Sequence, residues 1–282
     1  MEATLARPAL DRAALRRAVV TGHGLWTGLD VVVRTGSTNA DLIAAARAGA
    51  PEGRVLVAEQ QTAGLGRAGR RWTSPPRAGL AVSVLLRPGA AGDATGPVPV
   101  VRWGWLPMLA GVALAGAVGR VTGLVTTLKW PNDLLVAGGK CAGILAEAAG
   151  EAVVVGIGLN VTLRAGELPE APPGAPPATS LALAGAPGTD RGLLLRHLLD
   201  GLASWYAAWR AAGGDAGRCG LRAAYLAASD TVGRPVRVVL PGGQERVGTA
   251  VTVDGDGRLV LRDAFGAEHP VAAGDIRHLR AA

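Results

Sequence analysis

Lysine and asparagine are scarce in this 282-residue chain, which makes each one a candidate for chemistry. The lysines are Lys129 and Lys140, and the asparagines are Asn39, Asn132 and Asn160. Arginine supplies 27 of the 29 basic residues, so a generic positive charge here is an arginine. Lysine is a compact point charge, whereas arginine is a planar fork. Asparagine offers a neutral donor and acceptor together, which aspartate does not at neutral pH. These five positions are therefore the first candidates for a functional site.

A segment rich in glycine and arginine has the composition of an anion-binding loop. Residues 64–72 read Gly-Leu-Gly-Arg-Ala-Gly-Arg-Arg-Trp. Glycine lets backbone N–H groups approach an anion, and arginine binds phosphate oxygens in pairs. The segment lacks the Gly-Lys-Ser/Thr end of a P-loop. Taken alone, it fits a phosphate-binding loop and a solvent loop with scattered arginines equally well. Trp72 would cover an aromatic base or an apolar tail.

Both lysines lie in segments with further polar residues. Residues 129–133 read Lys-Trp-Pro-Asn-Asp just after an expected strand, and Lys140 begins a strand just after a Gly-Gly turn. An ordinary Pro-Asn-Asp turn and a solvent-facing edge charge are the simpler explanations. The scarcity of lysine and asparagine instead favours a functional site at these two segments.

Two more segments bring polar atoms or open backbone to the same region. Ser, Thr and Asn at 37–39 precede an Ala-rich run, which is typical of a helix N-cap. A helix N-terminus also binds anions and polar head groups, so the structural and functional interpretations are compatible. Residues 156–160, Gly-Ile-Gly-Leu-Asn, place glycines inside an apolar strand. This indicates either a bulge or a close approach to the backbone.

Hydrophobic periodicity and turn residues predict the elements that position these segments. We expect helices at residues 9–20, 41–47, 106–121, 191–212 and 218–228. We expect strands at residues 31–34, 54–58, 80–86, 126–130, 134–136, 142–146 and 153–156, with the last ended by Gly158. Four short strands follow at residues 236–240, 247–253, 259–262 and 268–271, and residues 169–178 are proline-rich and irregular. The sequence therefore predicts an α+β domain at 1–229 and a small β-barrel at 230–282.

Composition narrows the class of protein. With 49% hydrophobic residues the chain buries a sizeable core. The net charge of +7 indicates an anionic partner. The basic residues are dispersed and do not alternate with aromatic ones, which argues against an RNA-binding protein.

The cysteines, Cys141 and Cys219, make no disulfide framework or zinc site. With no secretory signal visible, we expect reduced thiols and a cytoplasmic location. The uncharged stretch at 103–119 is too short for a membrane span and predicts a buried helix.

Taken together, five segments resemble, in order and spacing, the biotin protein ligases (biotin–[acetyl-CoA-carboxylase] ligases). They are Gly-Ser-Thr-Asn at 36–39, Gln-Thr-Ala at 61–63 leading into the Gly/Arg loop, Lys-Trp-Pro-Asn-Asp-Leu at 129–134, Lys-x-x-Gly-Ile-Leu-x-Glu at 140–147 and the 156–160 segment. The resemblance covers about residues 30–282. It implies a catalytic domain with helices packed on a mixed β-sheet, and the β-rich tail looks like the family's SH3-like C-terminal domain. About thirty residues precede the Ser-Thr-Asn segment, so the chain resembles the monofunctional type without a DNA-binding domain.

The resemblance implies a two-step reaction that uses ATP, Mg²⁺ and biotin. The biotin carboxylate attacks the α-phosphate of ATP to give biotinyl-5′-AMP and pyrophosphate, and a lysine of a biotin carboxyl carrier domain then takes the biotinyl group. It implies no DNA or membrane partner, and we expect a monomer or weak homodimer. A lipoate ligase or octanoyl transferase is the nearest alternative, and a biotin-sensing repressor without ligase activity is another.

The resemblance also implies roles by position. The biotin-binding residues would be Ser37, Thr38, Asn39, Gln61, Gly64, Gly66, Arg67, Lys140, Gly143 and Gly158. The ATP- and adenylate-binding residues would be Arg67, Arg70, Trp72, Lys129, Asn132, Asp133, Lys140 and Asn160. Lys140 and Arg67 would be catalytic, with Lys140 an electrostatic stabiliser, and Mg²⁺ would be held mainly by the ATP phosphates. Leu65 departs from the family, whose loop has arginine at this position.

Overall fold

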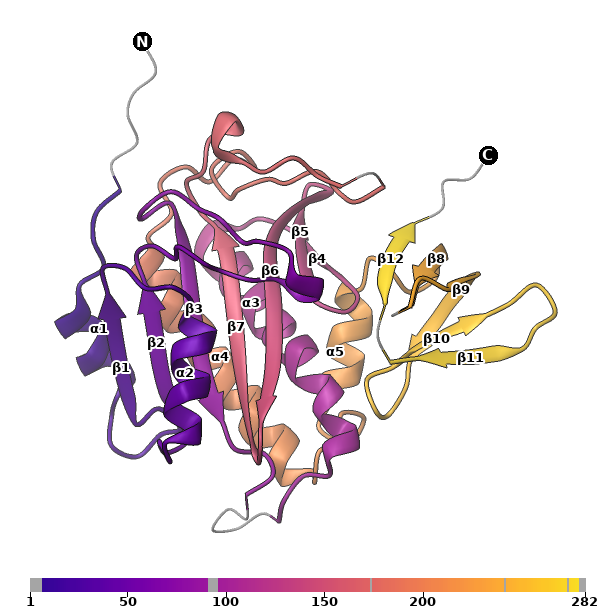
Figure 1. The fold of residues 1–282 in the computed structure, drawn as a ribbon, viewed down its shortest axis with the longest axis horizontal. Coiled ribbons are helices and arrows are strands. Elements are labelled where there is room, and N and C mark those ends of the chain that lie inside the picture. Colours follow the sequence, from indigo (N-terminus) through magenta and orange to yellow (C-terminus); the bar gives the residue numbers. More distant parts are fainter. Residues whose placement is uncertain (1–6, 91–95, 173, 241, 273, 279–282) are drawn as a thin grey trace.

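Two β-sheets and the helices around them make up the protein (Figure 1). The computed structural model describes residues 7–90, 96–172, 174–240, 242–272 and 274–278. The larger sheet has seven strands in the order β1-β2-β3-β7-β6-β5-β4. The β1–β2 pair is parallel and the other pairs are antiparallel. The predicted mixed sheet and α+β class are confirmed.

The strands of the larger sheet lie close to their predicted positions, with differences in the first strand, in β6, which extends three residues beyond the predicted 142–146 at each end, and in β7. They are β1 (Gly28–Val32), β2 (Arg54–Ala58), β3 (Gly79–Leu86), β4 (Thr126–Lys129), β5 (Asp133–Val136), β6 (Gly139–Ala149) and β7 (Ala152–Asn160). The first strand begins earlier than the β-branched run at 31–34, because it pairs with β2 from Gly28 onward. The prediction that Gly158 ends a strand is wrong: β7 continues to Asn160 because β3 and β6 pair with it on both sides.

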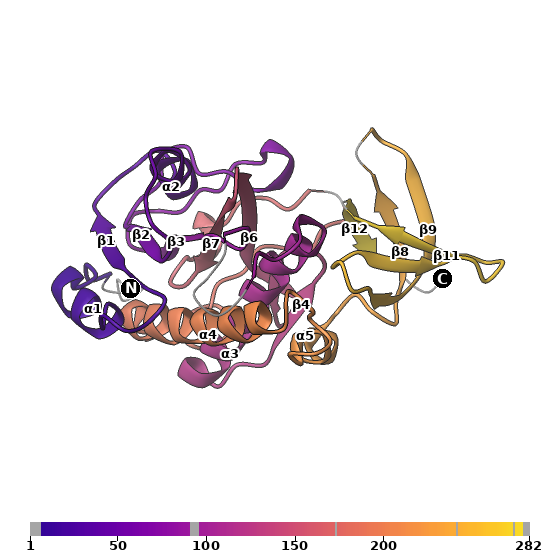
Figure 2. The ribbon, with the colours of Figure 1, turned by 90° about the horizontal axis from the view of Figure 1, so that it is seen from below.

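Five helices surround this sheet: α1 (Arg12–Val19), α2 (Thr38–Arg47), α3 (Leu106–Thr122), α4 (Arg191–Ala211) and α5 (Leu221–Ala228). Asp11, Ser37 and Asp190 cap α1, α2 and α4 by accepting backbone N–H groups. In Figure 2, α2 lies on one side of the sheet and α3 and α4 on the other. Short 3₁₀ turns occur at η1 (Arg67–Gly69), η2 (Val100–Trp105) and η3 (Ala165–Glu167).

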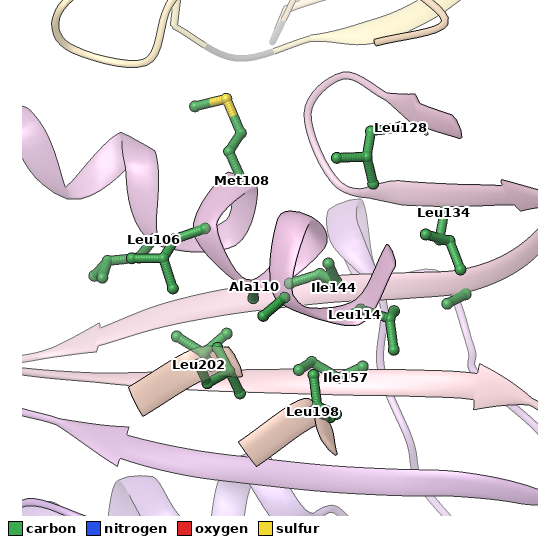
Figure 3. Close-up of a cluster of buried hydrophobic side chains, with 14 of the residues drawn as sticks. Leu106, Met108, Ala110, Leu114, Leu128, Leu134, Ile144, Ile157, Leu198 and Leu202 are labelled. Carbon is green, nitrogen blue, oxygen red and sulfur yellow. The ribbon is translucent and has the colours of Figure 1, made fainter. Parts of the chain in front are cut away.

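The apolar core lies between the sheet and the α3–α4 pair (Figure 3). Leu106, Met108 and Leu114 of α3 are at most 1% exposed, and Ile157 of β7 and Leu198 of α4 are buried with them. The helical stretch Val100–Thr122 is 23 residues long and apolar enough to cross a membrane by length and composition. The sequence argument that this stretch is too short for a membrane span is therefore wrong. The helix is explained by packing, since 56% of its most apolar window is buried inside the protein. The predicted buried helix is confirmed.

A buried ion pair ties the N-terminal segment to the sheet. Arg191 at the start of α4 contacts Glu59, just after β2, at 2.7 Å, and both side chains are 6% exposed. Glu59 also accepts the Leu10 N–H, and Arg191 donates to the carbonyls of Pro8 and Gly79. Because both carboxylate oxygens of Glu59 and both terminal guanidinium nitrogens of Arg191 have partners, the pair can remain ionised in the interior.

The C-terminal sheet has five antiparallel strands in the order β11-β10-β9-β8-β12. They are β8 (Pro235–Val239), β9 (Glu245–Val253), β10 (Leu259–Arg262), β11 (Glu268–Val271) and β12 (Asp275–His278). Four were predicted, and the short charged β12 was missed. Pairing between β11 and β12, which would close a barrel, does not occur in the described residues.

Two buried indoles dock this sheet onto the larger domain. Trp105 donates to the Gly255 carbonyl at 3.0 Å, and Trp130 donates to the Gly257 carbonyl at 3.3 Å. A Cβ atom on Gly104 would lie 2.6 Å from the Asp256 carbonyl oxygen, so the turn at 254–257 packs directly on the backbone. The C-terminal sheet is thereby fixed beside the segments that carry the candidate site.

Candidate active site

A cavity of about 420 Å³ lies where the segments singled out in the sequence meet. Its wall includes the start of α2, the Gly/Arg loop, the β4–β5 hairpin, the glycines of β6 and β7, and residues of the C-terminal sheet. The predicted site residues on this wall are Ser37, Thr38, Asn39, Gln61, Gly66, Arg67, Arg70, Trp72, Lys129, Asn132, Asp133, Lys140, Gly143, Gly158 and Asn160. Gly64 is the predicted residue outside this lining: it lies behind the wall, where a Cβ would be 2.6 Å from the Trp72 carbonyl oxygen.

One end of the cavity is neutral and polar. The Thr38 N–H donates to Gln61 Oε1 at 2.8 Å, which joins the first turn of α2 to the segment after β2. Ser37 accepts the Ala40 N–H as the N-cap, so the predicted cap is confirmed. Thr38 and Asn39 are buried, at 3% and 7% exposure. This end therefore offers hydroxyl and amide groups rather than charges.

The glycines of β7 bring side chains close to the sheet. A Cβ on Gly156 would overlap Asn39 Oδ1, and a Cβ on Gly158 would overlap the Trp72 ring. Gly143, the β6 neighbour of Gly158, also faces that ring. The register from β7 to β3 and β6 is continuous, so these glycines mark close approach and not a bulge.

The Gly/Arg loop folds back on itself above the cavity. Gly66 N–H donates to the Arg70 carbonyl at 2.6 Å, and Trp72 N–H donates to the Gly64 carbonyl at 2.9 Å. Gly69 has φ +70°, a left-handed conformation that glycine adopts without strain. Arg67 donates to the Gly274 carbonyl at 3.3 Å, which connects the loop to the C-terminal sheet. Leu65 is 54% exposed at the mouth of the cavity.

The β4–β5 hairpin holds its polar residues by internal hydrogen bonds. The Asn132 side chain donates to the Ile144 carbonyl at 2.8 Å, and the Ile144 N–H donates back to the Asn132 carbonyl at 2.9 Å. Lys129 is 7% exposed and donates to the Ile276 carbonyl of β12 at 2.8 Å. The peptide bond between Trp130 and Pro131 is cis. Asn132 thus fixes the hairpin to β6, and Lys129 fixes it to the C-terminal sheet.

Lys140 and Asp133 form an ion pair on the cavity wall. The Lys140 Nζ lies 2.6 Å from Asp133 Oδ1, and the side chains are 29% and 13% exposed. This oxygen has no aligned hydrogen bond in the described structure, so the contact is ionic. Tyr225 of α5 lies behind it, and burial, followed by the charge of Asp133, raises the pKa of Tyr225 above its ordinary value. An anionic ligand would compete with Asp133 for Lys140.

Asn160, the last predicted site residue, ends β7 and contacts the chain just after the proline-rich segment. The Asn160 side chain donates to the Thr179 carbonyl at 2.9 Å, and its backbone carbonyl accepts from the Cys141 thiol. Burial raises the pKa of Cys141 to about 12, so the thiol stays neutral near pH 7. Cys141 is a core residue and not a nucleophile, as the sequence indicated.

Sequence reasoning assigned no role to two polar residues of this region, of which Ser83 is buried and Glu147 half-buried. Ser83 on β3 is fully buried and lies 2.7 Å from Thr38 Oγ1, and Glu147 on β6 accepts from the Asn39 side chain at 2.7 Å. A signal existed for both: Ser83 is a lone hydroxyl in an apolar strand, and Glu147 closes the Lys-x-x-Gly-Ile-Leu-x-Glu segment. Val239, Gly274 and Ile276 of the C-terminal sheet were also missed as lining residues.

Comparison with known proteins gives two matching family profiles. The Biotin/lipoate A/B protein ligase family matches residues 34–162, and the Biotin protein ligase C terminal domain matches residues 231–279. The chain is 45% identical to a biotin–[acetyl-CoA-carboxylase] ligase of Mycobacterium tuberculosis over 278 residues, covering 97% of each chain. It is 34% identical to an enzyme of the same name from Paracoccus denitrificans, covering 84% of this chain and 95% of that one.

Solved structures show the same fold. The biotin protein ligase from Aquifex aeolicus in complex with biotin and ATP superimposes with a TM-score of 0.72 at 24% identity. The match covers 91% of this chain and all of that chain.

Proposed function

Because the chain belongs to the biotin protein ligase family, we infer that it is an ATP-dependent ligase that attaches biotin to acetyl-CoA carboxylase. The observation that carries this inference is the cavity, in which five segments spread over more than a hundred residues converge. One end of the cavity is neutral and polar, and the other carries arginine and lysine. Biotin and the ATP phosphates have that same division between a neutral head and anionic groups.

The reaction proceeds in two displacements. A biotin carboxylate oxygen bonds to the α-phosphorus of ATP, and the bond from that phosphorus to the bridging oxygen breaks to release pyrophosphate. An amine of a carrier lysine then bonds to the acyl carbon of biotinyl-5′-AMP, loses a proton and expels AMP. The first step brings two anions together, so fixed cations lower its barrier.

We propose that the neutral end holds the biotin head group. The ureido group has two N–H donors and one carbonyl acceptor, and the residues at this end are Ser37, Thr38, Asn39 and Gln61. An octanoyl or lipoyl chain presents no such polar head and would place apolar carbon against these hydroxyl and amide groups. This polar set favours biotin over a fatty acyl substrate.

The cationic end is proposed to hold the reacting groups. Lys140 would leave Asp133 and contact the carboxylate and α-phosphate oxygens, as an electrostatic stabiliser and not a base. Arg67 would hold the same two groups, while Arg70 and Lys129 face the polyphosphate. Since Arg67 and Lys129 donate to β12 and the segment before it, the C-terminal sheet would position both cations.

The nucleotide is proposed to extend from this end toward β7. Trp72 and Asn160 would lie near the adenine, and Asn132 and Asp133 near the polyphosphate. Within the described residues, no three His, Cys, Asp or Glu side chains gather into a metal-binding group. We propose that Mg²⁺ is held mainly by the ATP phosphates, where it would supply further positive charge.

The acceptor is proposed to be the biotin carboxyl carrier domain of an acyl-CoA carboxylase. We also propose a cytoplasmic location, where Cys141 and Cys219 stay as the free thiols that the structure contains. A monomer or weak homodimer without DNA binding remains our expectation.

The test is transfer of radiolabelled biotin by the purified protein to a carboxyl carrier domain, with MgATP. We expect label on the carrier lysine that depends on ATP, and none on a carrier whose lysine is replaced by arginine. Folded protein that transfers no label would overturn the assignment. Transfer of octanoate in place of biotin would instead favour the lipoate branch of the family.

A further inference from the structure

A chain of four polar side chains runs behind the neutral end of the cavity. Ser83 Oγ lies 2.7 Å from Thr38 Oγ1 and 2.6 Å from Asn39 Oδ1. Asn39 Nδ2 donates to Glu147 Oε2 at 2.7 Å and to the Leu145 carbonyl at 3.3 Å. Ser83 is fully buried and Thr38 and Asn39 nearly so, so water does not supply alternative partners to these three side chains, whereas Glu147 is half-buried.

The far end of this chain fixes the orientation of the Asn39 amide. The Glu147 carboxylate and the Leu145 carbonyl are both acceptors, so the NH₂ group must face them. The amide oxygen must then face Ser83. Gly156 leaves the space in which the amide lies against the sheet, because a Cβ there would overlap Asn39 Oδ1.

The number of hydroxyl hydrogens then fixes the donor and acceptor roles of Ser83 and Thr38, at the cavity end of the chain. A serine hydroxyl has one hydrogen, and Asn39 Oδ1 has none, so Ser83 donates to Asn39. The 2.7 Å contact between Ser83 and Thr38 therefore needs the hydrogen of the Thr38 hydroxyl. The Thr38 hydroxyl has this one hydrogen for two contacts, Ser83 Oγ at 2.7 Å and Gln61 Oε1 at 3.0 Å, and the shorter contact takes it. Gln61 Oε1 does not need that hydrogen, since it already accepts the Thr38 N–H at 2.8 Å.

We propose that Ser83 and Glu147 are specificity-determining residues that make the Thr38 hydroxyl an acceptor, and not a donor, toward the cavity. Neither side chain is among the residues that line the cavity, so both act through Asn39 and Thr38. The inference rests on the proposed function, because it takes biotin as the ligand whose ureido N–H meets Thr38. A head group that places an oxygen opposite Thr38 meets a second acceptor and is rejected.

The test compares biotin with its two cyclic carbamate analogues, in each of which a ring oxygen replaces one ureido N–H. For the wild-type protein we expect one analogue to bind about tenfold or more weakly than biotin, since one hydrogen bond is lost and two acceptors face each other. In Ser83→Ala the Thr38 hydroxyl loses its acceptor at 2.7 Å, so its hydrogen can turn to Gln61 Oε1 or to the ligand. We expect the ratio of the analogue's dissociation constant to that of biotin to fall to within about threefold. The KM for ATP, and kcat at saturating biotin, stay near their wild-type values.

Two further variants separate this role from a structural one. Glu147→Gln keeps shape but lets the Asn39 amide adopt either orientation, so we expect the ratio to fall in the same direction even if Ser83→Ala folds poorly. Ser180→Ala is the matched control: Ser180 is fully buried and bonded to the Leu163 carbonyl and the Leu183 N–H, away from this chain. It should lower the unfolding temperature and leave the ratio unchanged.

A wild-type ratio retained in both Ser83→Ala and Glu147→Gln overturns the inference. Wild-type protein that binds both carbamates as tightly as biotin also overturns the inference, but it does not contradict the proposed ligase function. Wild-type protein that binds neither biotin nor its analogues refutes the proposed function itself.

Discussion

Replacing Lys140 with alanine tests the electrostatic role of the ion pair on the cavity wall. Lys140 Nζ lies 2.6 Å from Asp133 Oδ1, and the Asp133 side chain is only 13% exposed. The change removes a cation aimed at the developing charge, which typically costs a factor of about 10²–10³ in rate, or about 2.7–4 kcal/mol. It also leaves Asp133 as an uncompensated carboxylate where an anionic substrate must bind. We therefore expect Lys140→Ala to lose at least about a thousandfold in biotinyl-5′-AMP formation.

A double-mutant cycle separates the two contributions. Adding Asp133→Asn to Lys140→Ala removes the unpaired charge, and we expect it to restore about tenfold, or about 1.4 kcal/mol. Lys140→Arg keeps the charge but replaces the compact ammonium by a planar fork, so a loss of at least about tenfold is expected. Pyrophosphate release in a single turnover measures the first step, and transfer from added biotinyl-5′-AMP measures the second.

The control is Arg237→Ala, which also removes an ion-paired cation, 2.9 Å from Glu245, but on the C-terminal sheet. We expect its rate within about twofold of wild type, because an exposed pair contributes little. Lys140→Ala with folded protein and a rate within about threefold of wild type would refute the electrostatic role. Near-normal activity of Lys140→Arg would refute the reasoning that scarce lysines mark positions where arginine cannot serve.

Three more changes have definite expected results. In Gly158→Ala the new Cβ overlaps the Trp72 ring, so the KM for biotin should rise at least about tenfold in steady-state assays, with a smaller effect on unfolding temperature. Arg191→Met leaves Glu59 as a buried unpaired charge, so urea titration should show a loss of about 3–5 kcal/mol in the free energy of unfolding. Because burial raises the pKa of Cys141 to about 12, iodoacetamide at pH 8 should modify only Cys219 in the folded protein, as read by mass spectrometry.

Each of these has its own control. Gly116 lies inside α3, where an added Cβ would have no neighbouring atom within 4 Å, so Gly116→Ala should leave the KM for biotin unchanged and add up to about 1 kcal/mol of stability. Glu59→Gln added to Arg191→Met should recover part of the lost stability, and no recovery would mean that packing, not charge, explains the loss. Equal labelling of Cys141 and Cys219 at pH 8 would contradict the burial argument, and labelling of both in urea is the positive control.

The sequence predicts the fold well where local patterns decide it. Residues 54–58 are a strand at the predicted bounds, and Ser37 caps α2 as the Ser-Thr-Asn segment indicated. It fails where distant pairing decides: β7 continues through Gly156 and Gly158 because both of its neighbours hold it in register. The missed β12 is four residues of mixed polarity that form a strand only by pairing with β8.

The same division holds for the site. The scarcity of lysine and asparagine singled out five residues, the family resemblance implied the others, and fifteen of the predicted residues line one cavity. Neither the scarcity nor the resemblance revealed how those residues are held. Asn39 lines the cavity, and its amide is bonded to Ser83 and Glu147, from strands far away in sequence. The lining residues of the C-terminal sheet could not be predicted from local sequence either, since only the docking of the two sheets brings Gly274 and Ile276 to the cavity.

The two lysines have a practical consequence for anyone who labels this protein. Lys129 is 7% exposed and hydrogen-bonded to β12, and Lys140 is paired with Asp133 inside the cavity. An outer surface whose side-chain cations are all guanidinium groups gives an amine-reactive ester almost nothing to acylate besides the terminal amine. Such an ester, ordinarily an indiscriminate surface reagent, should act here as an active-site probe, with ATP protecting Lys140 from it. Biotinyl-5′-AMP that escapes is itself an acylating agent of this kind, so the enzyme should carry little biotin of its own.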